Sequence, residues 1–357
     1  MLTVGQEHHD PMEIHVGGGL RAITFSADGE YVFTGGRGRV RVWRVKDGKQ
    51  MATMKADGVL CLAGSNDGRW IAAGTSLGDV LVWDAKTYKE VFVHKEDDWD
   101  INGVDFSPDS TRLVSASDNY SAIVWDTASA TRERVQTLPH EDKVFAAKYS
   151  PHGDRIATAT SRSVRVYDGN VGLVLVDINA TVTQWYNTGL LWFNNHLLVI
   201  SDGQIKQFKA STGSAVSEWP IPDTDQFSCI ALPKHGEFIA CSTQRTVTLW
   251  DTATHTRVGL IQHPQEIRSI VLSPDDLFIA ISGRDGKIII QSLSRIIVSN
   301  MARRNCDTSL LALIMVTYGA QSICLIYSPP SRNQTLRLTT LCSILGSTVN
   351  SRTQKHY

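Results

Sequence analysis

Short stretches of apolar residues recur at a nearly fixed interval along most of the chain, and six of the seven contain an aromatic side chain near their end. Each stretch alternates apolar and polar positions or is rich in β-branched residues, which is typical of a β-strand. The residues at this position follow one another at steps of 40, 42, 42, 41, 42 and 41 residues. This phasing predicts a repeat protein whose units share one supersecondary structure. The seven residues are Trp43, Trp83, Trp125, Tyr167, Phe208, Trp250 and Gln291.

A second landmark, rich in Ser, Pro, Asp and Gly, lies roughly 17 to 19 residues before most of these positions. These residue types favour a tight reversal between two strands. In the first unit, strands are expected at Leu20–Phe25, Tyr31–Thr34 and Val40–Val45. Each unit thus has about four short strands and must stack against its neighbours to bury its faces. The landmark occurs at Phe25–Gly29, Gly64–Gly68, Phe106–Ser110, Tyr149–Gly153, Leu232–Gly236 and Leu272–Asp276.

Over about residues 12–295, these phased units resemble the repeats of the WD-repeat (WD40) family. The resemblance implies an all-β fold, a seven-bladed β-propeller of four-stranded antiparallel blades. We expect a flexible N-terminus at 1–11, the propeller at 12–298 and an irregular, disordered tail at 299–357. The third strand of each blade should contain residue 43, 83, 125, 167, 208, 250 or 291. Two strands could close the ring in the seventh blade: Met12–Val16 or Arg295–Ser299.

Proteins of this family typically join a histidine, a Ser or Thr, an Asp and the tryptophan in one hydrogen-bonded set. The resemblance implies that only the third unit approaches this set, with Asn119 in the place of the Asp. The fourth unit keeps His140 and the seventh keeps His263. We interpret these histidines as structural and expect rigidity to come mainly from apolar packing between blades. The structural residues assigned in this way are His94, Ser117, Asn119, Trp125, Trp43, Trp83 and Trp250.

The tail departs from the repeat pattern. Residues 308–331 carry no charge and follow Arg303 and Arg304, so their length would suffice to cross a bilayer. Gly319–Ser322 interrupts the apolar run, and we therefore expect a disordered or loosely attached tail instead of a membrane anchor. A membrane anchor and an error of gene prediction are the alternative interpretations of this segment.

Charge and cysteine content narrow the classes of function. The chain has 35 basic and 36 acidic residues, a formal net charge of −1. Residues 296–357 contain six of the basic residues and one of the acidic ones, so residues 1–295 contain 29 basic and 35 acidic residues. A net −6 argues against a nucleic-acid or membrane surface as the main partner. The six cysteines form no CxxC pair, and Met1–Pro11 lacks the apolar run of a secretory signal. We therefore expect an intracellular protein, cytoplasmic or nuclear.

No motif of catalysis was found. The glycine clusters at Gly17–Gly19 and Gly35–Gly38 lack the strand-to-helix context and the Lys-Ser/Thr pair of a phosphate loop. Neither a Gly-x-Ser-x-Gly nor a His-Glu-x-x-His sequence occurs. We predict no catalytic residue, no metal and no cofactor.

Charged loops suggest a binding surface instead. The family resemblance implies that the loops between blades and the turns between second and third strands share the narrower face of the ring. The loops between blades are acidic, and the turns between second and third strands carry arginine at intervals. These charges are either solvated and paired with one another, or they form an interaction face. Trp99 lies in a highly charged loop, so its ring either anchors a partner or folds back over the blade. The candidate residues are Trp99, Asp98, Arg37, Arg162, Arg245 and Arg284, and Trp185-Tyr186 is a second aromatic candidate.

The sequence thus predicts a non-catalytic protein-interaction scaffold that assembles a multiprotein complex through this face. A chromatin- or nucleic-acid-associated propeller subunit is the first alternative, and it would need a continuous basic stripe. A propeller enzyme or small-ligand binder is the second, because the central channel of a propeller can host chemistry.

Overall fold

The computed structural model of this chain describes residues 11–95, 98–129, 131–180, 182, 189–201, 203–220, 229–234, 236–293 and 296, with the backbone of 313–318 and 321–326. The chain divides into two compact units, Met1–Ile297 and Val298–Tyr357. The second aromatic candidate, Trp185-Tyr186, lies outside the described residues.

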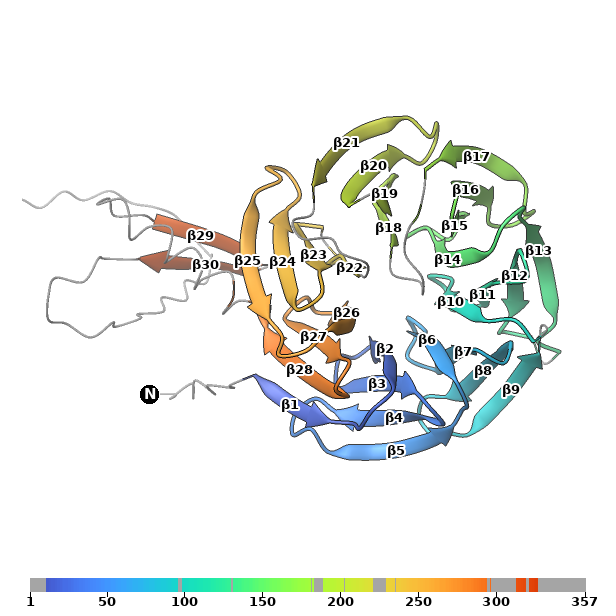
Figure 1. Cartoon of the computed structure of the whole chain (residues 1–357), viewed down its shortest axis with the longest axis horizontal. Coiled ribbons are helices and arrows are strands. Elements are labelled where there is room, and N and C mark those ends of the chain that lie inside the picture. The colour runs from blue at the N-terminus through green and yellow to red at the C-terminus, as the bar shows by residue number, and fades with distance from the viewer. Residues whose placement is uncertain are drawn as a thin grey trace, which may run out of the picture. The chain divides into compact units, whose positions relative to one another are not determined.

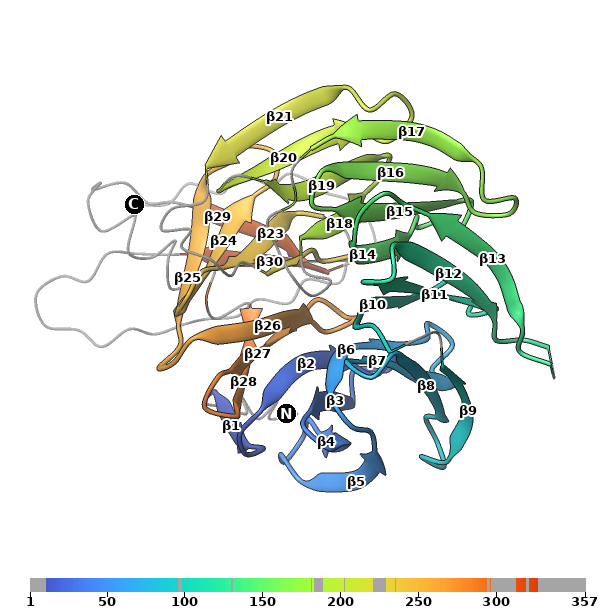
Figure 2. The same cartoon turned by 45° about the vertical axis from the view of Figure 1, so that its right-hand side comes forward.

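Seven four-stranded antiparallel sheets stand around a common centre in the first unit, as the blades of a propeller (Figure 1). The first strand of each blade lines the centre and the fourth lies at the rim, as a second view also shows (Figure 2). The fold class predicted from the repeats is confirmed.

The blades are numbered here from the first complete sheet. Blade 1 consists of β2 (Leu20–Phe25), β3 (Tyr31–Gly36), β4 (Arg39–Arg44) and β5 (Gln50–Lys55). Blade 2 consists of β6 (Val59–Gly64), β7 (Trp70–Thr75), β8 (Asp79–Asp84) and β9 (Glu90–Lys95). Blade 3 consists of β10 (Ile101–Phe106), β11 (Arg112–Ser117), β12 (Ser121–Asp126) and β13 (Arg134–Pro139). Blade 4 consists of β14 (Val144–Tyr149), β15 (Arg155–Thr160), β16 (Ser163–Asp168) and β17 (Val174–Asn179).

The remaining blades include the shortest strands of the ring. Blade 5 consists of β18 (Leu190–Phe193), β19 (His196–Ser201), β20 (Gln204–Lys209) and β21 (Ala215–Pro220). Blade 6 consists of β22 (Ile230–Ala231), β23 (Phe238–Ser242), β24 (Thr246–Asp251) and β25 (Arg257–Gln262). Blade 7 consists of β26 (Ile267–Leu272), β27 (Phe278–Gly283), β28 (Lys287–Ser292) and β1 (Met12–His15). Every residue of the phased series lies on the third strand of its blade, as predicted.

The ring is closed by a strand from the start of the chain. β1 pairs with β28 in an antiparallel register that places Met12 opposite Ile290 and His15 opposite Lys287. The first of the two predicted closures is therefore confirmed. The alternative strand, Arg295–Ser299, lies outside the described residues except for Ile296.

Apolar side chains fill the space between neighbouring blades. Val42 of blade 1 belongs to the same buried cluster as Trp83 of blade 2, and Val82 of blade 2 to the same cluster as Trp125 of blade 3. In blades 1 to 4, the valine that precedes the aromatic contributes to the core on one side of its blade, and the aromatic contributes to the core on the other, because consecutive strand residues face opposite ways. Packing between blades therefore forms the interior, as predicted.

A serine organises the turns between first and second strands. Ser65 Oγ accepts a hydrogen bond from the Trp70 N–H at 2.8 Å and donates one to Asp67 at 2.6 Å. Ser26, Ser107 and Ser273 make the same pair of contacts in their own turns. This arrangement explains why Ser and Asp stand two residues apart in the landmark, since both cap the reversal.

The structure corrects the predicted hydrogen-bonded set of the third unit. Trp125 Nε1 donates to Ser115 Oγ at 2.9 Å, and Trp43 Nε1 donates to Thr34 Oγ1 at the same distance. Ser115 pairs with Ile123 in the sheet, so it lies beside the indole, whereas Ser117 pairs with Ser121 at the turn. The assignment of Ser117 to this set is wrong.

Asn119 also has a local function. Its Oδ1 accepts hydrogen bonds from the Ser121 N–H at 3.1 Å and from Ser121 Oγ at 2.7 Å, which caps the turn between β11 and β12.

His94 occupies a different slot from the one the resemblance implies. In blade 2, His94 pairs with Val80 of the third strand. At the equivalent position of blade 3, Leu138 pairs with Ala122. His94 stacks on Trp125, with ring centroids 4.2 Å apart and planes 12° apart, and burial lowers its pKa. His94 therefore replaces an aliphatic side chain and acts through packing.

Blade 4 contains the histidine-centred set instead. His140 Nδ1 lies 3.0 Å from the Leu138 carbonyl, and Nε2 lies 2.8 Å from Thr158 Oγ1 and 3.2 Å from the Tyr167 hydroxyl. A carbonyl can only accept, so Nδ1 carries the proton and Nε2 accepts from a hydroxyl. Burial lowers the pKa of His140 to about 4.

The central tryptophans differ in burial. Trp83 is 2% exposed, Trp125 4% and Trp43 7%, whereas Trp250 is only partly buried. Trp250 Nε1 donates to Thr248 Oγ1 at 3.0 Å, on the same strand. Trp250 packs against the buried cluster between blades 5 and 6, although part of its side chain stays exposed.

The second unit has one regular element in its described part. β29 (Leu313–Tyr318) and β30 (Gln321–Ile326) pair as an antiparallel hairpin within the predicted tail. They lie within the uncharged segment 308–331. No helix in the described part of the chain is long and apolar enough to cross a membrane.

Removing residues 300–357 should leave the ring folded. The closing strand comes from β1, and the contact pattern separates the tail from Met1–Ile297. We expect a single cooperative urea transition with a midpoint close to that of the full chain. In contrast, removing residues 1–16 deletes β1 and should abolish the cooperative unfolding transition. If the chain without residues 300–357 shows no cooperative transition, β1 is not sufficient to close the ring.

Candidate functional site

The loops between blades and the turns between second and third strands meet at one end of the ring. Backbone hydrogen bonds join them: His263 N–H donates to the Arg245 carbonyl at 2.7 Å, Arg284 N–H to the Glu266 carbonyl at 2.7 Å, and Asp118 N–H to the Asp100 carbonyl at 2.9 Å. The surface made by these loops and turns is called the narrow face below. The six candidate binding residues all belong to it.

The four candidate arginines are exposed but do not form an even ring. Arg245, Arg284 and Arg37 stand on blades 6, 7 and 1, which are neighbours, whereas Arg162 stands on blade 4. The first three are called the arginine arc below. The repeat spacing correctly predicted that these arginines lie in turns. Which of them are neighbours depends on the order of the blades around the ring.

Two of these arginines are paired with acidic residues of the adjoining loop. Arg284 lies 3.1 Å from Glu266, which also pairs with Arg268 at 3.3 Å. Arg162 lies 3.8 Å from Asp142 and keeps 87% of its side chain exposed, and Arg284 keeps 69%. Such exposed pairs contribute little to stability and leave the guanidinium groups accessible to a ligand.

Trp99 stands in the loop between β9 and β10, which joins blade 2 to blade 3. Its side chain is 54% exposed, and the Lys143 ammonium lies 5.9 Å from the ring centroid. Lys143 in turn donates to Asp118 at 2.5 Å, and Asp118 accepts from Asn102 Nδ2 at 2.7 Å. The indole therefore lies beside a cation that a buried network holds in place, with half of its surface open to solvent.

The acidic residues near Trp99 differ in environment. Asp98 is 89% exposed and pairs with Lys95 at 2.7 Å, which lowers the pKa of Asp98. Burial raises the pKa of Asp100, and the nearby Asp118 raises it further, while Arg21 and Lys143 act in the opposite direction. Asp98 is thus available to a ligand, whereas Asp100 belongs to the supporting network.

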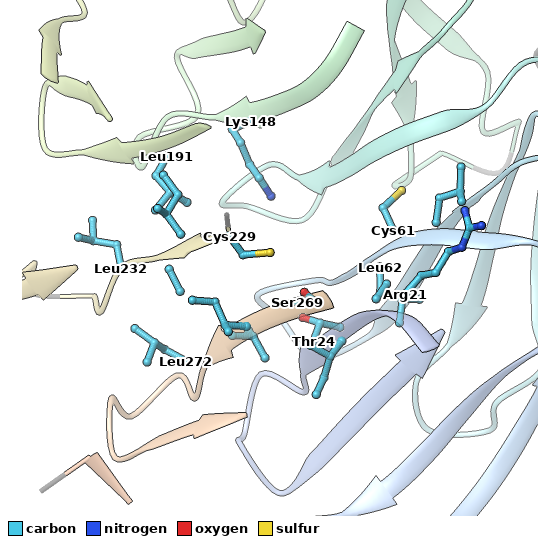
Figure 3. Close-up of a pocket in the computed structure, with 17 residues that line it drawn as sticks. Arg21, Thr24, Cys61, Leu62, Lys148, Leu191, Cys229, Leu232, Ser269 and Leu272 are labelled. Atoms are coloured by element: carbon cyan, nitrogen blue, oxygen red, sulfur yellow. The ribbon is translucent and has the colours of Figure 1, made fainter. Parts of the chain in front are cut away.

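A cavity of about 250 Å³ lies at the centre of the ring (Figure 3). Strands β2, β6, β14, β18, β22 and β26 line it, and Lys148 projects into it (Figure 3). Lys148 Nζ is 3.0 Å from Asp105, and the thiols of Cys61 and Cys229 donate to the carbonyls of Ile101 and Arg268. These three side chains are thus engaged within the protein.

Among the described residues, no group of three or more His, Cys, Asp or Glu side chains is arranged to hold a metal. The buried histidines serve packing and hydrogen bonding, as the contacts of His94 and His140 show.

Lys143, Asp118 and Asn102 were missed by sequence reasoning. Asn102 and Asp118 lie on a strand and a turn of blade 3, and Lys143 lies in the loop that leads to blade 4, so the three meet where these consecutive blades pack together. The one available signal was Lys143, a lone basic residue in the otherwise acidic inter-blade loop that contains Glu141 and Asp142.

Comparison with known proteins agrees with the repeat pattern. A family model described as "WD domain, G-beta repeat" matches the chain six times, and the matched segments end at or next to the third strands. The segments are residues 10–44, 48–84, 86–126, 132–168, 219–251 and 254–290. The fifth unit, around Phe208, lies between two matches although it builds a complete blade.

Several curated relatives are similar at low identity. Periodic tryptophan protein 2 homolog of Dictyostelium discoideum is 23% identical over 65% of this chain and 21% of its own length. Autophagy-related protein 16 of Arabidopsis thaliana is 24% identical over 78% of this chain and 48% of its own length. U3 small nucleolar RNA-associated protein 15 homolog of Xenopus laevis is 24% identical over 66% of this chain and 46% of its own length. The chain thus spans less than half the length of these three relatives.

Proposed function

The chain belongs to the WD-repeat (WD40) family, and from this premise we propose that it is a non-catalytic scaffold that binds a protein partner at its narrow face. The observation that carries the proposal is the exposed Trp99 beside Lys143, on the same face as the arginine arc. Large aromatic and arginine side chains supply most of the binding energy in protein interfaces. Both types are exposed on this face.

The chemistry of the face indicates the kind of segment it binds. Arginine offers planar, bidentate contacts to carboxylates, and an indole flanked by a cation accommodates an apolar or aromatic side chain. We therefore expect a partner segment with acidic residues that reach Arg284 and the other members of the arc, and one apolar anchor placed on Trp99. The exposed carboxylate of Asp98 would reject segments that carry acidic groups next to the anchor.

A ribonucleoprotein subunit is the second candidate function. It is favoured by the name of one relative, the U3 small nucleolar RNA-associated protein 15 homolog. A basic arc of three arginines could contact phosphates, yet residues 1–295 carry an excess of acidic groups. The two candidate functions are distinguished by the salt dependence of ligand capture and by whether the captured ligand is protein or RNA.

Changing Trp99→Ala together with Arg284→Ala should weaken capture of the partner by about tenfold or more, because both hot-spot side chains are lost. The full chain is immobilised, and proteins and RNA captured from a cell extract are quantified at about 0.1 and about 0.5 M salt. The parent chain should lose protein partners as salt rises.

The matched control changes Met51→Ala with Lys86→Ala, one exposed apolar and one exposed basic residue away from the narrow face. This control should capture the parent's partners unchanged. If the Trp99/Arg284 double variant retains the same partners with the same salt dependence, the narrow face is not the binding site. RNA captured by the purified parent chain without protein would favour the second candidate.

A further inference from the structure

The outer corner of blade 4 exposes four apolar side chains within five residues. Val171 is 64% exposed, Leu173 66%, Val174 52% and Leu175 49%. They belong to the turn after β16 and to the start of the outermost strand, β17. These four residues are called the corner patch. Large apolar side chains that stand together on a protein surface can mark an interaction site.

Comparison with the other blades shows that the repeat does not require this patch. Val174 is the residue paired with the central aromatic, and the equivalent positions are Gln50, Glu90, Arg134, Ala215 and Arg257. The position before it is Leu173 in blade 4, and elsewhere it is Lys49, Lys89, Glu133, Ser214 and Thr256. Charged and polar residues at such positions protect an edge strand from pairing with another chain. Blade 4 alone among these six replaces both with large apolar residues.

The corner patch is held in place by contacts to blade 3. Gly172 adopts φ +72°, and a Cβ there would lie 3.1 Å from Leu138, so the turn packs directly on the neighbouring blade. The Asn170 carbonyl accepts a hydrogen bond from the Gln136 side chain. The Asp168 carboxylate accepts from the Val171 N–H at 3.0 Å. A surface that is ordered in advance binds a ligand at a lower entropic cost.

The edge of β17 favours an extended ligand. β17 is the last strand of its sheet and pairs only with β16, so its outer backbone edge is open. Val174 is the first residue of β17 and Leu173 precedes it, and both are more than half exposed. A strand that lies along the edge contacts side chains on both faces, whereas a helix on one face cannot.

A second copy of the chain fits the patch less well. Each partner of a stable dimer usually buries about 800 Å². The rim of the ring is convex (Figure 1), so two rings that met at this corner would touch over a small area. A slender segment can follow the rim and gains backbone hydrogen bonds in addition to apolar contact.

We infer that blade 4 binds an extended apolar segment of a partner protein, which adds to β17 as a fifth strand over the corner patch. The segment carries β-branched or aliphatic residues at alternate positions and no proline, because proline removes a ladder donor. This site is independent of the narrow face. Leu175 is the extra residue of a bulge in β17, which shortens the regular edge, so the interaction is weak for a single segment.

The experiment uses the full chain and a synthetic decapeptide of alternating Val and Thr with a lysine at each end. Fluorescence anisotropy should show binding with a Kd of roughly 10 to 500 μM. The variant Leu173→Lys with Val174→Gln, which copies the residues of blade 1, should weaken binding about tenfold or more. Leu77→Lys, at a residue 50% exposed on blade 2, is the control and should bind as the parent does.

Two further probes separate strand addition from other modes of binding. A decapeptide with proline at two central positions should bind at least about fivefold more weakly, since it cannot complete the ladder. The inference is overturned if the parent does not bind the alternating peptide, if the Leu173/Val174 variant binds it equally, or if an amphipathic helical peptide binds more tightly. It is also overturned if sedimentation equilibrium shows a dimer that the Leu173/Val174 variant abolishes, because the patch would then be occupied by a second copy.

Discussion

Trp125→Ala is expected to lower the free energy of unfolding by about 3 to 5 kcal/mol, as for other large-to-small changes of a buried aromatic. The indole is 4% exposed and packs in the cluster between blades 2 and 3. Its loss leaves a cavity, removes the stacking partner of His94 and deprives Ser115 Oγ of its indole donor. Urea unfolding monitored by circular dichroism measures the change.

Three control variants separate these contributions. Trp125→Phe retains most of the ring but loses the hydrogen bond, and should cost about 1 to 2 kcal/mol. Trp250→Ala should cost clearly less than Trp125→Ala because Trp250 is only partly buried. Trp99→Ala should change stability by no more than about 0.5 kcal/mol, since surface substitutions usually stay within this range. A loss below about 1 kcal/mol for Trp125→Ala would mean that the contact between blades 2 and 3 does not limit stability.

Acidification from pH 6.5 to pH 5 should cost the ring roughly 2 kcal/mol through His140 alone, at 1.36 kcal/mol for each pH unit. Burial lowers the pKa of His140 to about 4, against 6.5 for an unperturbed histidine. Because the folded pKa is the lower one, the unfolded chain binds the proton first. The stabilisation is therefore complete above pH 6.5 and is lost as the pH falls toward about 4.

The physical cause is the neutral imidazole between two blades. His140 is 9% exposed, and its Nε2 accepts a hydrogen bond from a hydroxyl, so protonation would place an N–H where an acceptor is required. In His140→Gln, the loss of unfolding free energy between pH 6.5 and pH 5 should shrink by roughly 2 kcal/mol relative to the parent. An NMR titration that gives His140 a pKa of about 6 or higher would contradict this account.

The candidate site was only partly predictable. Trp99 and the four arginines were found because turn and loop positions repeat along the chain, and all are exposed as a ligand requires. The grouping of three arginines into an arc could not be predicted, since it depends on which blades stand next to each other. The Lys143–Asp118–Asn102 network beside Trp99 joins side chains up to 41 residues apart in sequence.

The exposure of the corner patch could not be predicted from the sequence either. In the sequence, Leu173 to Val176 reads as an ordinary apolar strand, which is more often buried than exposed. Its position as the outermost strand of blade 4 is what leaves Leu173 and Val174 at the surface.

The sequence by itself determined the number of blades, the position of every third strand and the turns that precede it. These features depend on local chemistry, on strand alternation and Ser-Asp turns, repeated at a nearly constant interval. The tertiary structure decided what depends on register and on neighbours. It selected β1 as the closing strand, and it placed Ser115 and not Ser117 beside Trp125. It also made His140 the centre of the buried set. A shift of two residues leaves the pattern of a strand unchanged but exchanges the side chain that faces the adjacent blade, so only packing distinguishes the alternatives.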